Sequence, residues 1–344
     1  MELIICDKDY KKIGIIDASD VLWTTRYYDV GDFELHIPLL DEYLNILVEE
    51  NYVFRSSNKQ FALIEKINIK NNIDNSSEIV VSGRFVECLL ERRIIWSQTQ
   101  INGLLESGIR NLISDNFIVP TLPFRKMSEI KLGTYKGYNE KINTQYTGDN
   151  VLMVIKDICK SYGLGFKFIF DDKNFYFELY KGINRSKSQK ELPFVAFSDE
   201  FDNLLSSEYQ YDVSNYKNSA LVAGEGEGLD RKTQSINDNI SGISRREIFV
   251  DARDLSSNSD NVSNMEYSAT LLQRGNEALV EFSNIENFTS QIDEVGNFKY
   301  DIDYKIGDIV TIYDSRINKM ADKRIVEIIE CEDEKGYRVS PTFE

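Results

Sequence analysis

Near its N-terminus the chain reads Val53-Phe54-Arg55, Leu63-Ile64-Glu65-Lys66-Ile67 and Glu78-Ile79-Val80-Val81, three β-type runs separated by polar turns. The same pattern returns near the other end as Ile309-Val310-Thr311-Ile312, Ile325-Val326-Glu327-Ile328-Ile329 and Tyr337-Arg338-Val339-Ser340. Apolar and β-branched residues dominate both sets of runs, which predicts two similar three-stranded β-meanders. Glu65 and Glu327 occupy matching points in the two meanders.

The duplicated meander predicts two superposable small β-barrels. If the two barrels correspond strand for strand, we expect four apolar side chains to be buried at equivalent places: Leu63, Ile67, Ile325 and Ile329. Two similar modules in one chain let a few subunits imitate a ring of more subunits. The pattern therefore favours a structural, assembly-forming role over a catalytic one.

The remaining sequence predicts an α+β protein that is mainly β. Residues 1–97 form the first β-barrel domain, and residues 98–200 form a peripheral α+β domain. Residues 201–344 form the second β-barrel domain, with a helical insertion at about 252–295. The two barrels therefore bracket the α+β domain along the chain.

Several segments carry specific predictions of secondary structure. Apolar residues at helical spacing predict helices over 101–117, 147–165 and 262–286, the second of which begins at Asp149 and ends at Gly163. Residues 207–213 and 217–223 are predicted to pair as strands. Residues 246–251 are predicted to pair with the second of these strands.

The charge balance is strongly acidic. The 344 residues include 40 Lys and Arg against 57 Asp and Glu, a net charge of −17. Binding to nucleic-acid phosphates requires a basic surface, so we expect no specific nucleic-acid binding. Acidity also keeps a protein soluble, and charge alone does not separate these two roles.

No run approaches the roughly 18 apolar residues needed to span a bilayer, and no secretion signal is visible, so we expect synthesis in the cytoplasm of the cell that makes it.

The sequence predicts no catalytic, cofactor-binding or metal-binding residue, and no cofactor. The four cysteines lack CxxC spacing and lie in apolar runs, as small core residues do: Cys6, Cys88, Cys159 and Cys331. His36 is the one histidine and sits in an alternating strand, which argues against a multi-histidine metal site. The glycine-rich stretch 224–228 places two carboxylates where a phosphate would sit, so it is interpreted as an acidic hairpin tip.

Two kinds of charge cluster allow more than one interpretation. The acidic groups Asp199, Glu200 and Asp202, and Asp251 with Asp254, permit a paired-acid glycosidase in composition, although such clusters arise by chance in so acidic a chain. The basic spots could pair with acids across subunit contacts or form ordinary surface salt bridges: Arg84, Arg92, Arg93, Arg245 and Arg246.

Several stretches together resemble the baseplate-hub proteins of phage tails, of the siphovirus type also found in contractile, phage-tail-like bacteriocins. They are Trp23-Thr24-Thr25-Arg26-Tyr27-Tyr28-Asp29-Val30-Gly31-Asp32-Phe33-Glu34-Leu35, Gly83-Arg84-Phe85, Leu90-Glu91-Arg92-Arg93-Ile94-Ile95-Trp96, Phe197-Ser198-Asp199-Glu200-Phe201-Asp202-Asn203-Leu204, Tyr216-Lys217-Asn218 with Gly224–Gly228, and Tyr304-Lys305-Ile306-Gly307-Asp308. The resemblance runs essentially from end to end, and none of its stretches is a catalytic signature.

The family is similar to the T-even phage baseplate hub, which implies two small β-barrels per subunit and a homotrimer around a channel. The implied function is a symmetry adapter in the virion tail or phage-tail-like particle. Its implied partners are the sixfold tail tube or distal tail protein ring and a threefold central spike protein, with a baseplate wedge or tape-measure protein as further partners. The acidic charge balance suits a channel through which DNA slides.

Many siphovirus relatives carry a C-terminal extension with fibre or lytic domains, whereas this sequence ends at Pro341-Thr342-Phe343-Glu344. We therefore expect spike and lysin to be separate chains. Two alternatives to the hub remain open: a tail-associated cell-wall-degrading enzyme and a module that binds surface polysaccharide.

Overall fold

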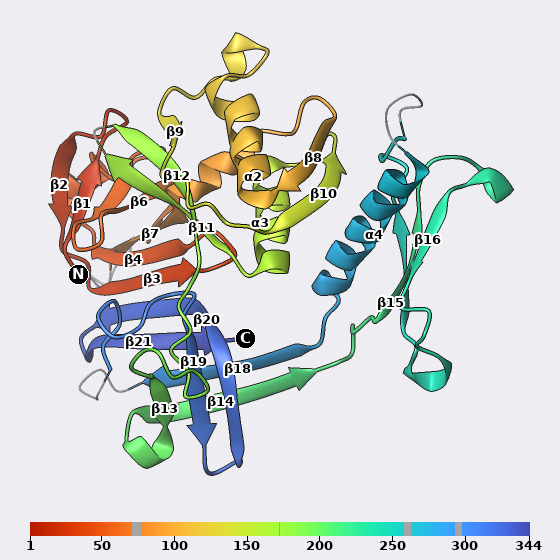
Figure 1. Ribbon diagram of the computed structural model, residues 1–344. Coiled ribbons are helices and arrows are strands. Elements are labelled where there is room, and N and C mark those ends of the chain that lie inside the picture. Colours follow the sequence, from red (N-terminus) through yellow and green to blue (C-terminus); the bar gives the residue numbers. More distant parts are fainter. Residues whose placement is uncertain (71–76, 172, 258–262, 293–297) are drawn as a thin grey trace.

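The computed structural model describes residues 1–344 except 71–76, 172, 258–262 and 293–297 (Figure 1). Strands hold 43% of the residues and helices 21%, so the predicted α+β, mainly β class is confirmed. No helix in the described ranges is long and apolar enough to cross a membrane.

One twisted sheet of 13 strands runs through both ends of the chain. Its main path follows β14 (Leu204–Asp212), β18 (Ile285–Ile292), β21 (Gly336–Phe343), β20 (Lys319–Asp333), β3 (Asp20–Arg26), β4 (Asp32–Pro38), β7 (Glu78–Phe85), β6 (Gln60–Lys70), β5 (Tyr52–Arg55), β1 (Leu3–Cys6) and β2 (Lys12–Ile16). Two further strands branch from β20, namely β19 (Ile309–Asp314) and, beside it, β13 (Ala196–Ser198).

Both predicted meanders are present, as β5–β6–β7 and as β19–β20–β21. The expectation of two separate barrels is wrong. Antiparallel pairing of β3 with β20 joins the meanders into one sheet, and none of the sheets among the described residues closes into a barrel. On the side away from β4, the backbone groups of β3 form their hydrogen bonds with β20 of the other meander. Because these strands pair with each other, neither meander closes on itself.

The four side chains expected to be buried at equivalent points divide into two pairs. Leu63 and Ile325 are buried, whereas Ile67 and Ile329 are half-buried. A β-bulge interrupts the β6–β7 ladder between Ile64 and Lys66, and another interrupts β20–β21 between Ile325 and Glu327. A bulge changes the face on which later side chains lie, which explains why strict alternation does not carry burial along the whole strand.

The α+β module packs on the first meander and shares its hydrophobic core. It consists of β8 (Thr99–Leu104), α2 (Leu105–Ile113), the π-helical turn η2 (Ser114–Ile118), the 3₁₀ turn η3 (Pro123–Arg125), β9 (Ile130–Leu132), β10 (Lys141–Tyr146), α3 (Val151–Tyr162), β11 (Gly165–Asp171) and β12 (Asn174–Tyr180). Two short helical segments precede this module in the chain, α1 (Asp41–Leu44) and the 3₁₀ segment η1 (Val86–Arg92).

Two helix predictions in this module need correction. The predicted helix 101–117 begins as strand β8, whose backbone groups pair with β10, and becomes helical only at Leu105. Helix α3 is capped by Asn150, not Asp149, because the Asn150 side chain accepts hydrogen bonds from the amides of Leu152 and Met153. Its predicted end at Gly163 is confirmed by a left-handed backbone with φ of 65°.

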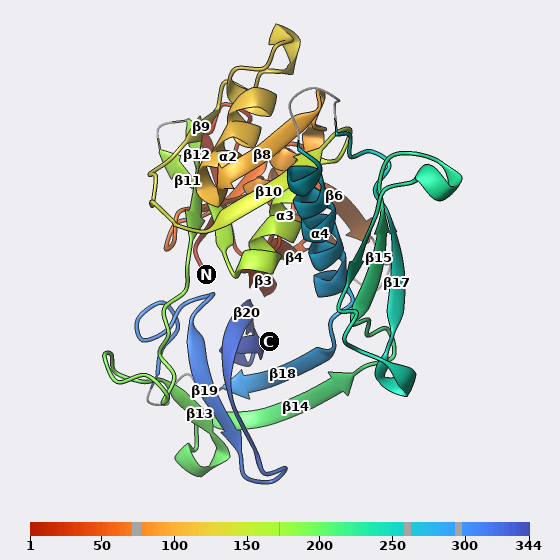
Figure 2. The ribbon, with the colours of Figure 1, turned by 45° about the vertical axis from the view of Figure 1, so that its right-hand side comes forward.

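Strands β14 and β18 form a ribbon that leads to an arm (Figures 1 and 2). The arm contains β15 (Ser219–Ala223), the turn η5 (Gly228–Asp230), β16 (Thr233–Ile236), the turn η6 (Gly242–Ser244), β17 (Glu247–Asp251) and α4 (Asn264–Glu281). It has its own small core, in which Tyr267 and Leu271 of α4 pack against the three strands.

The arm corrects one strand pairing and confirms another. The predicted pairing of 207–213 with 217–223 is wrong, because β14 pairs with β18 and β15 pairs with β16 and β17. The predicted pairing of 246–251 with 217–223 is confirmed as the parallel β15–β17 ladder. Helix α4 lies within the predicted 262–286 segment and begins at a capping box of Ser263 and Glu266.

Candidate functional site

The junction between the two meanders is the first candidate site, because it fixes their relative placement. Strands β3 and β20 pair over six residues, from Val21 opposite Glu332 to Arg26 opposite Glu327. We call this ladder and the ion pairs that flank it the seam. Since its partners are about 300 residues apart in sequence, the seam joins the two ends of the chain in one sheet.

A buried ion pair holds one side of the seam. Arg55 on β5 donates to both carboxylate oxygens of Glu330 on β20, at 2.5 and 2.6 Å. The Tyr337 hydroxyl also donates to Glu330, and the Arg55 guanidinium lies 5.9 Å from the centre of the Trp23 ring. Arg55 and Glu330 are only 8% and 1% exposed, so each charge depends on the other for its solvation.

Matched glutamates flank the sheet on its more exposed side. Glu327 accepts a hydrogen bond from Arg26 at 2.8 Å, and Arg26 also pairs with Asp32 on β4. Glu65, at the equivalent point of the first meander, accepts two hydrogen bonds from Arg84, each at 2.8 Å. The two positions that matched in sequence therefore have the same use, which is to pair with an arginine from a neighbouring strand.

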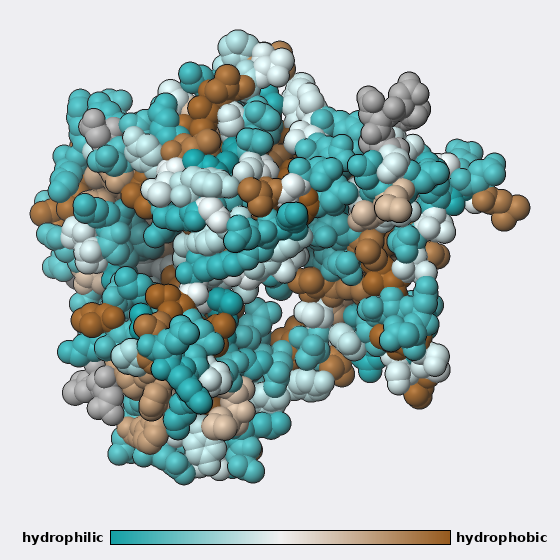
Figure 3. All heavy atoms as spheres, in the orientation of Figure 1, coloured by the Kyte–Doolittle hydropathy of each residue, from teal (hydrophilic) through white to brown (hydrophobic). Residues whose placement is uncertain are grey.

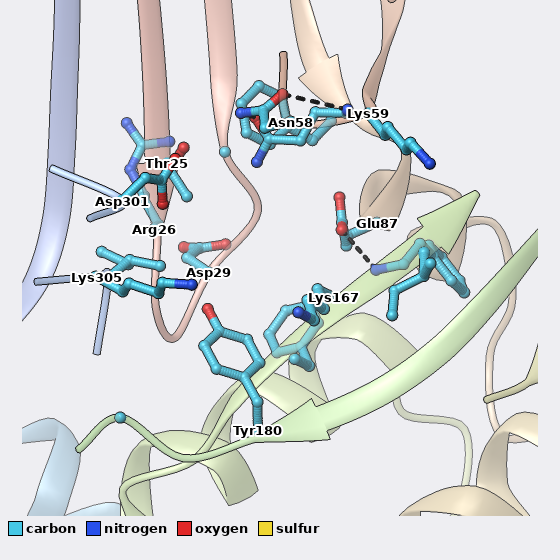
Figure 4. A pocket seen from close by; sticks show the side chains of 18 of the residues that line it. Thr25, Arg26, Asp29, Asn58, Lys59, Glu87, Lys167, Tyr180, Asp301 and Lys305 are labelled. Carbon is cyan, nitrogen blue, oxygen red and sulfur yellow. Dashed lines mark hydrogen bonds between the residues drawn. The ribbon is translucent and has the colours of Figure 1, made fainter. Parts of the chain in front are cut away.

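A pocket of about 380 Å³ opens beside the seam (Figure 4). Figure 4 shows side chains from β3 and the loop behind it, from the β5–β6 turn and from β11 and β12 converging on one hollow. The segment that carries Asp301 and Lys305 closes another side. The pocket is therefore the point where the first meander, the α+β module and the C-terminal segment meet.

Charges of both signs line this pocket. Glu87 accepts a hydrogen bond of 2.7 Å from the Phe168 amide, and burial raises the pKa of its carboxyl to about 7. Burial also raises the pKa of Asp301 and lowers the pKa of Lys167, whose ammonium lies 5.2 Å from the centre of the Tyr180 ring. These shifts reflect desolvation where three segments meet.

The side chains that line the described part of the pocket are mainly charged, aromatic and aliphatic. Among the described residues that line it, none is Ser, Cys or His. His36 lies on β4 between Glu34 and Glu78, at 3.1 and 3.0 Å, and the side-chain hydrogen bond to Glu78 raises its pKa. No group of three or more potential metal ligands occurs in the part of the chain that the structure describes.

Three of the five acidic residues considered for a paired-acid mechanism, Asp199, Asp251 and Asp254, are engaged in structural contacts. Asp199 accepts hydrogen bonds from the Ser315 amide, at 2.9 Å, and hydroxyl. Asp251 pairs with Arg231 and Arg253, and Asp254 pairs with Arg274. The stretch 224–228 leads into the η5 turn at the outer end of the arm, as the interpretation of an acidic hairpin tip requires.

The basic spots differ in their partners. Arg84 pairs with Glu65 and Glu91, and Arg245 pairs with Glu247 and Asp238, so both are ordinary intrachain salt bridges. Arg246 donates to the Val213 carbonyl. Arg92 reaches Glu50 only at 4.0 Å, and Arg93 donates to backbone carbonyls.

Among the described strands, β2 and β14 each pair on one side only, so the two ends of the sheet path are open edges with apolar side chains. At the β2 edge Ile13 and Ile15 are exposed, and at the β14 edge Leu205 and Tyr211 are exposed. Open edges present unpaired backbone groups to which another chain can add. The two edge strands are therefore candidate contact surfaces between proteins. The alternation of apolar and polar residues in the sequence did not distinguish these edge strands from interior strands.

Solved structures with a similar fold include three tail proteins. The 43 kDa tail protein of prophage MuSo2 from Shewanella oneidensis matches 100% of this chain and 98% of its own, with a TM-score of 0.60 and 13% identity. A tail protein from Neisseria meningitidis MC58 matches 99% and 95%, with a TM-score of 0.59 and 14% identity. Prophage tail protein gp18 from Listeria monocytogenes EGD-e matches 99% and 94%, with a TM-score of 0.55 and 12% identity.

The family follows from the sequence itself. The chain belongs to the Siphovirus ReqiPepy6 Gp37-like proteins, whose family model matches residues 2–343. It is a phage tail protein of the siphovirus type, and the resemblance drawn from its sequence is confirmed. No curated protein sequence matches the chain.

Proposed function

We propose that this tail protein is the hub of the tail tip or baseplate, and that three copies join the sixfold tail tube to a threefold spike around a channel. The observation that carries the proposal is the pair of similar meanders joined by the seam. Three such chains present six meanders at fixed spacing, and closed cyclic symmetry is the usual form of soluble homo-oligomers.

The seam supports the adapter mechanism in physical terms. An adapter must transmit the geometry of one ring to the next without its modules moving apart. Here the modules share a hydrogen-bonded ladder and a buried ion pair, so that relative rotation would break both. A single continuous sheet is stiffer in this respect than two barrels on a linker.

The charge balance supports a channel that repels DNA. A net charge of −17 gives no reason for duplex DNA to adhere, and a polyanion passing through such a ring would meet like charge.

The proposed partners are the tube or distal tail protein ring on one face and the central spike on the other. The division into domains 1–97, 98–200 and 201–344 is part of this proposal, with the α+β module at the periphery.

Imaging of tails that carry an affinity label on this protein tests the proposed location. We expect the label at the tail tip, between the end of the tube and the base of the spike. Label distributed along the tube, or on side fibres, would refute the hub. Since we propose no catalytic role, purified protein should also leave peptidoglycan intact in a zymogram.

A further inference from the structure

A surface on the α+β module combines arginines with exposed apolar rings. It is a hollow of about 370 Å³ beside η3, and we call it the arginine–aromatic patch, lined by Glu91, Arg92, Arg93, Ile94, Trp96, Phe124 and Arg125. The Glu91 carboxylate pairs at 2.6 Å with Arg84, which is not one of the lining residues. Phe124 is 79% exposed and Trp96 is 58% exposed. Trp and Arg are the residues that most often dominate protein–protein binding energy.

The arginines of the patch lack strong carboxylate partners. Arg125 is 8% exposed, yet among the described residues its side chain donates only to the Ile94 carbonyl at 2.6 Å and the Asn116 side-chain oxygen at 3.2 Å. Its guanidinium lies 5.1 Å from the centre of the Trp96 ring. A buried cation without an anion is costly, so a carboxylate from outside the chain would be strongly favoured here.

The neighbouring arginines add to this unbalanced charge. Arg93 donates to the backbone carbonyls of Arg125, at 2.9 Å, and Arg92, at 2.8 Å. Burial first, and then the charges of Arg125 and Arg92, lower the pKa of Arg93. Arg92 reaches Glu50 only at 4.0 Å. In a chain of net charge −17, three arginines line this hollow together with one carboxylate, Glu91, which Arg84 already holds.

The outer end of the arm has the complementary character. The η5 turn carries Leu229, which is fully exposed, between Glu227 and Asp230. Within the described ranges neither of these two side-chain carboxylates forms a salt bridge, whereas the nearby Glu225 is held by Lys232. Figure 3 shows hydrophobic atoms at the end of the arm with hydrophilic atoms around them. We call residues 227–230 the acidic tip.

We propose that the acidic tip of one copy docks into the arginine–aromatic patch of a second copy. Leu229 would enter the hollow against Trp96 and Phe124, and Glu227 and Asp230 would pair with the patch arginines. Figures 1 and 2 both place the η5 turn at the outer end of the arm, away from the yellow turn around η3, so a chain does not serve its own patch. The contact rests on the proposed assembly of several copies.

The opposite tip of the same arm provides a matched control. The η6 turn carries Ile243, which is as exposed as Leu229, but the carboxylates near it, Asp238 and Glu247, are both paired with Arg245. Among its described residues, this tip therefore offers the patch arginines no carboxylate that is free of an arginine partner. Apolar exposure is thus the same at both tips, and the tips differ in whether a carboxylate is available to pair with the patch.

Disulfide trapping in assembled tails tests the contact directly. In a Cys331→Ser background the other native cysteines are buried, and the double variant Phe124→Cys with Leu229→Cys should give cross-linked oligomers after mild oxidation. The control with Phe124→Cys and Ile243→Cys should give monomers. Equal cross-linking in both variants, none in the first, or cross-linking of Phe124→Cys to a different tail protein would each overturn the proposal.

Charge reversal gives a second measurement that does not depend on cysteine geometry. Arg92→Glu alone and Glu227→Lys alone should each weaken self-association of the full chain at least about tenfold at low salt, and the two together should restore it. Failure of the pair to rescue overturns the contact. If tails contain three copies of the protein but no disulfide is trapped, this contact is rejected and the proposed hub is not. If the disulfide is trapped but the copy number is not three, the proposed hub is rejected and the contact stands.

Discussion

Removing the charge of Glu330 should be the most damaging conservative change in the seam. Glu330→Gln keeps the shape but leaves the Arg55 guanidinium buried without an anion, and it weakens two hydrogen bonds of 2.5 and 2.6 Å. Because the two side chains are 8% and 1% exposed, water cannot replace the lost carboxylate. We expect a loss of roughly 3–5 kcal/mol in the free energy of unfolding, as for other buried pairs broken on one side.

Urea unfolding followed by Trp23 fluorescence reports on this change. The chain has two tryptophans, so a Trp96→Phe background leaves Trp23 as the single probe. Trp23 is buried beside Arg55 and donates to the Gln60 side chain at 2.7 Å, which makes its emission sensitive to opening of the seam. The measured quantity is the shift of the unfolding midpoint multiplied by the denaturant slope.

Two controls separate a buried ion pair from an ordinary one. Arg55→Met with Glu330→Leu replaces both charges by apolar groups and should recover most of the loss. Glu50→Gln breaks the exposed pair with Lys8, at 2.9 Å, and should cost less than about 1 kcal/mol. A loss below about 1 kcal/mol for Glu330→Gln, or a double variant as unstable as the single one, would refute the reasoning.

Three further predictions concern pH, helix termination and DNA. Burial raises the pKa of Glu87 from 4.5 to about 7, so its protonated form is favoured in the folded state and stability falls as pH rises from 4.5 to 7, by at most about 3 kcal/mol. Glu87→Gln should remove this slope in urea titrations at pH 5 and pH 8, and an unchanged slope would contradict the assignment. Gly163→Ala should destabilise the protein by about 1 kcal/mol in thermal melts, because φ is 65° there, whereas a neutral result would show that the turn adapts. Duplex DNA should not be retained at low salt in a mobility assay, and binding that weakens steeply with added salt would argue against an acidic channel.

Local patterns in the sequence predicted the elements that local forces determine. Alternating apolar residues identified the strands of both meanders, and the stripe ending at Gly163 identified α3. These features depend on periodicity and on the conformational freedom of glycine, which a short window contains. The error at Asp149 is of the same kind, since Asp and Asn are equivalent as caps and only the geometry selects Asn150.

Long-range pairing was not predictable from the sequence in this way. Nothing in the run around Trp23 distinguishes β20 from β4 as a partner, and in the structure β3 pairs with both. The separation of β14 from β15 likewise depends on β18, which returns from the arm about 80 residues later. For the candidate site, the matched Glu65 and Glu327 were visible in sequence, but their arginine partners were not.

The central claim is that one chain with two joined meanders serves as a symmetry adapter. The most direct test is the number of copies per tail tip, counted by quantitative mass spectrometry against the tube and spike proteins and checked by imaging of the tip. The account predicts three copies, related by a threefold axis along the tail. Six copies, or one, would contradict it.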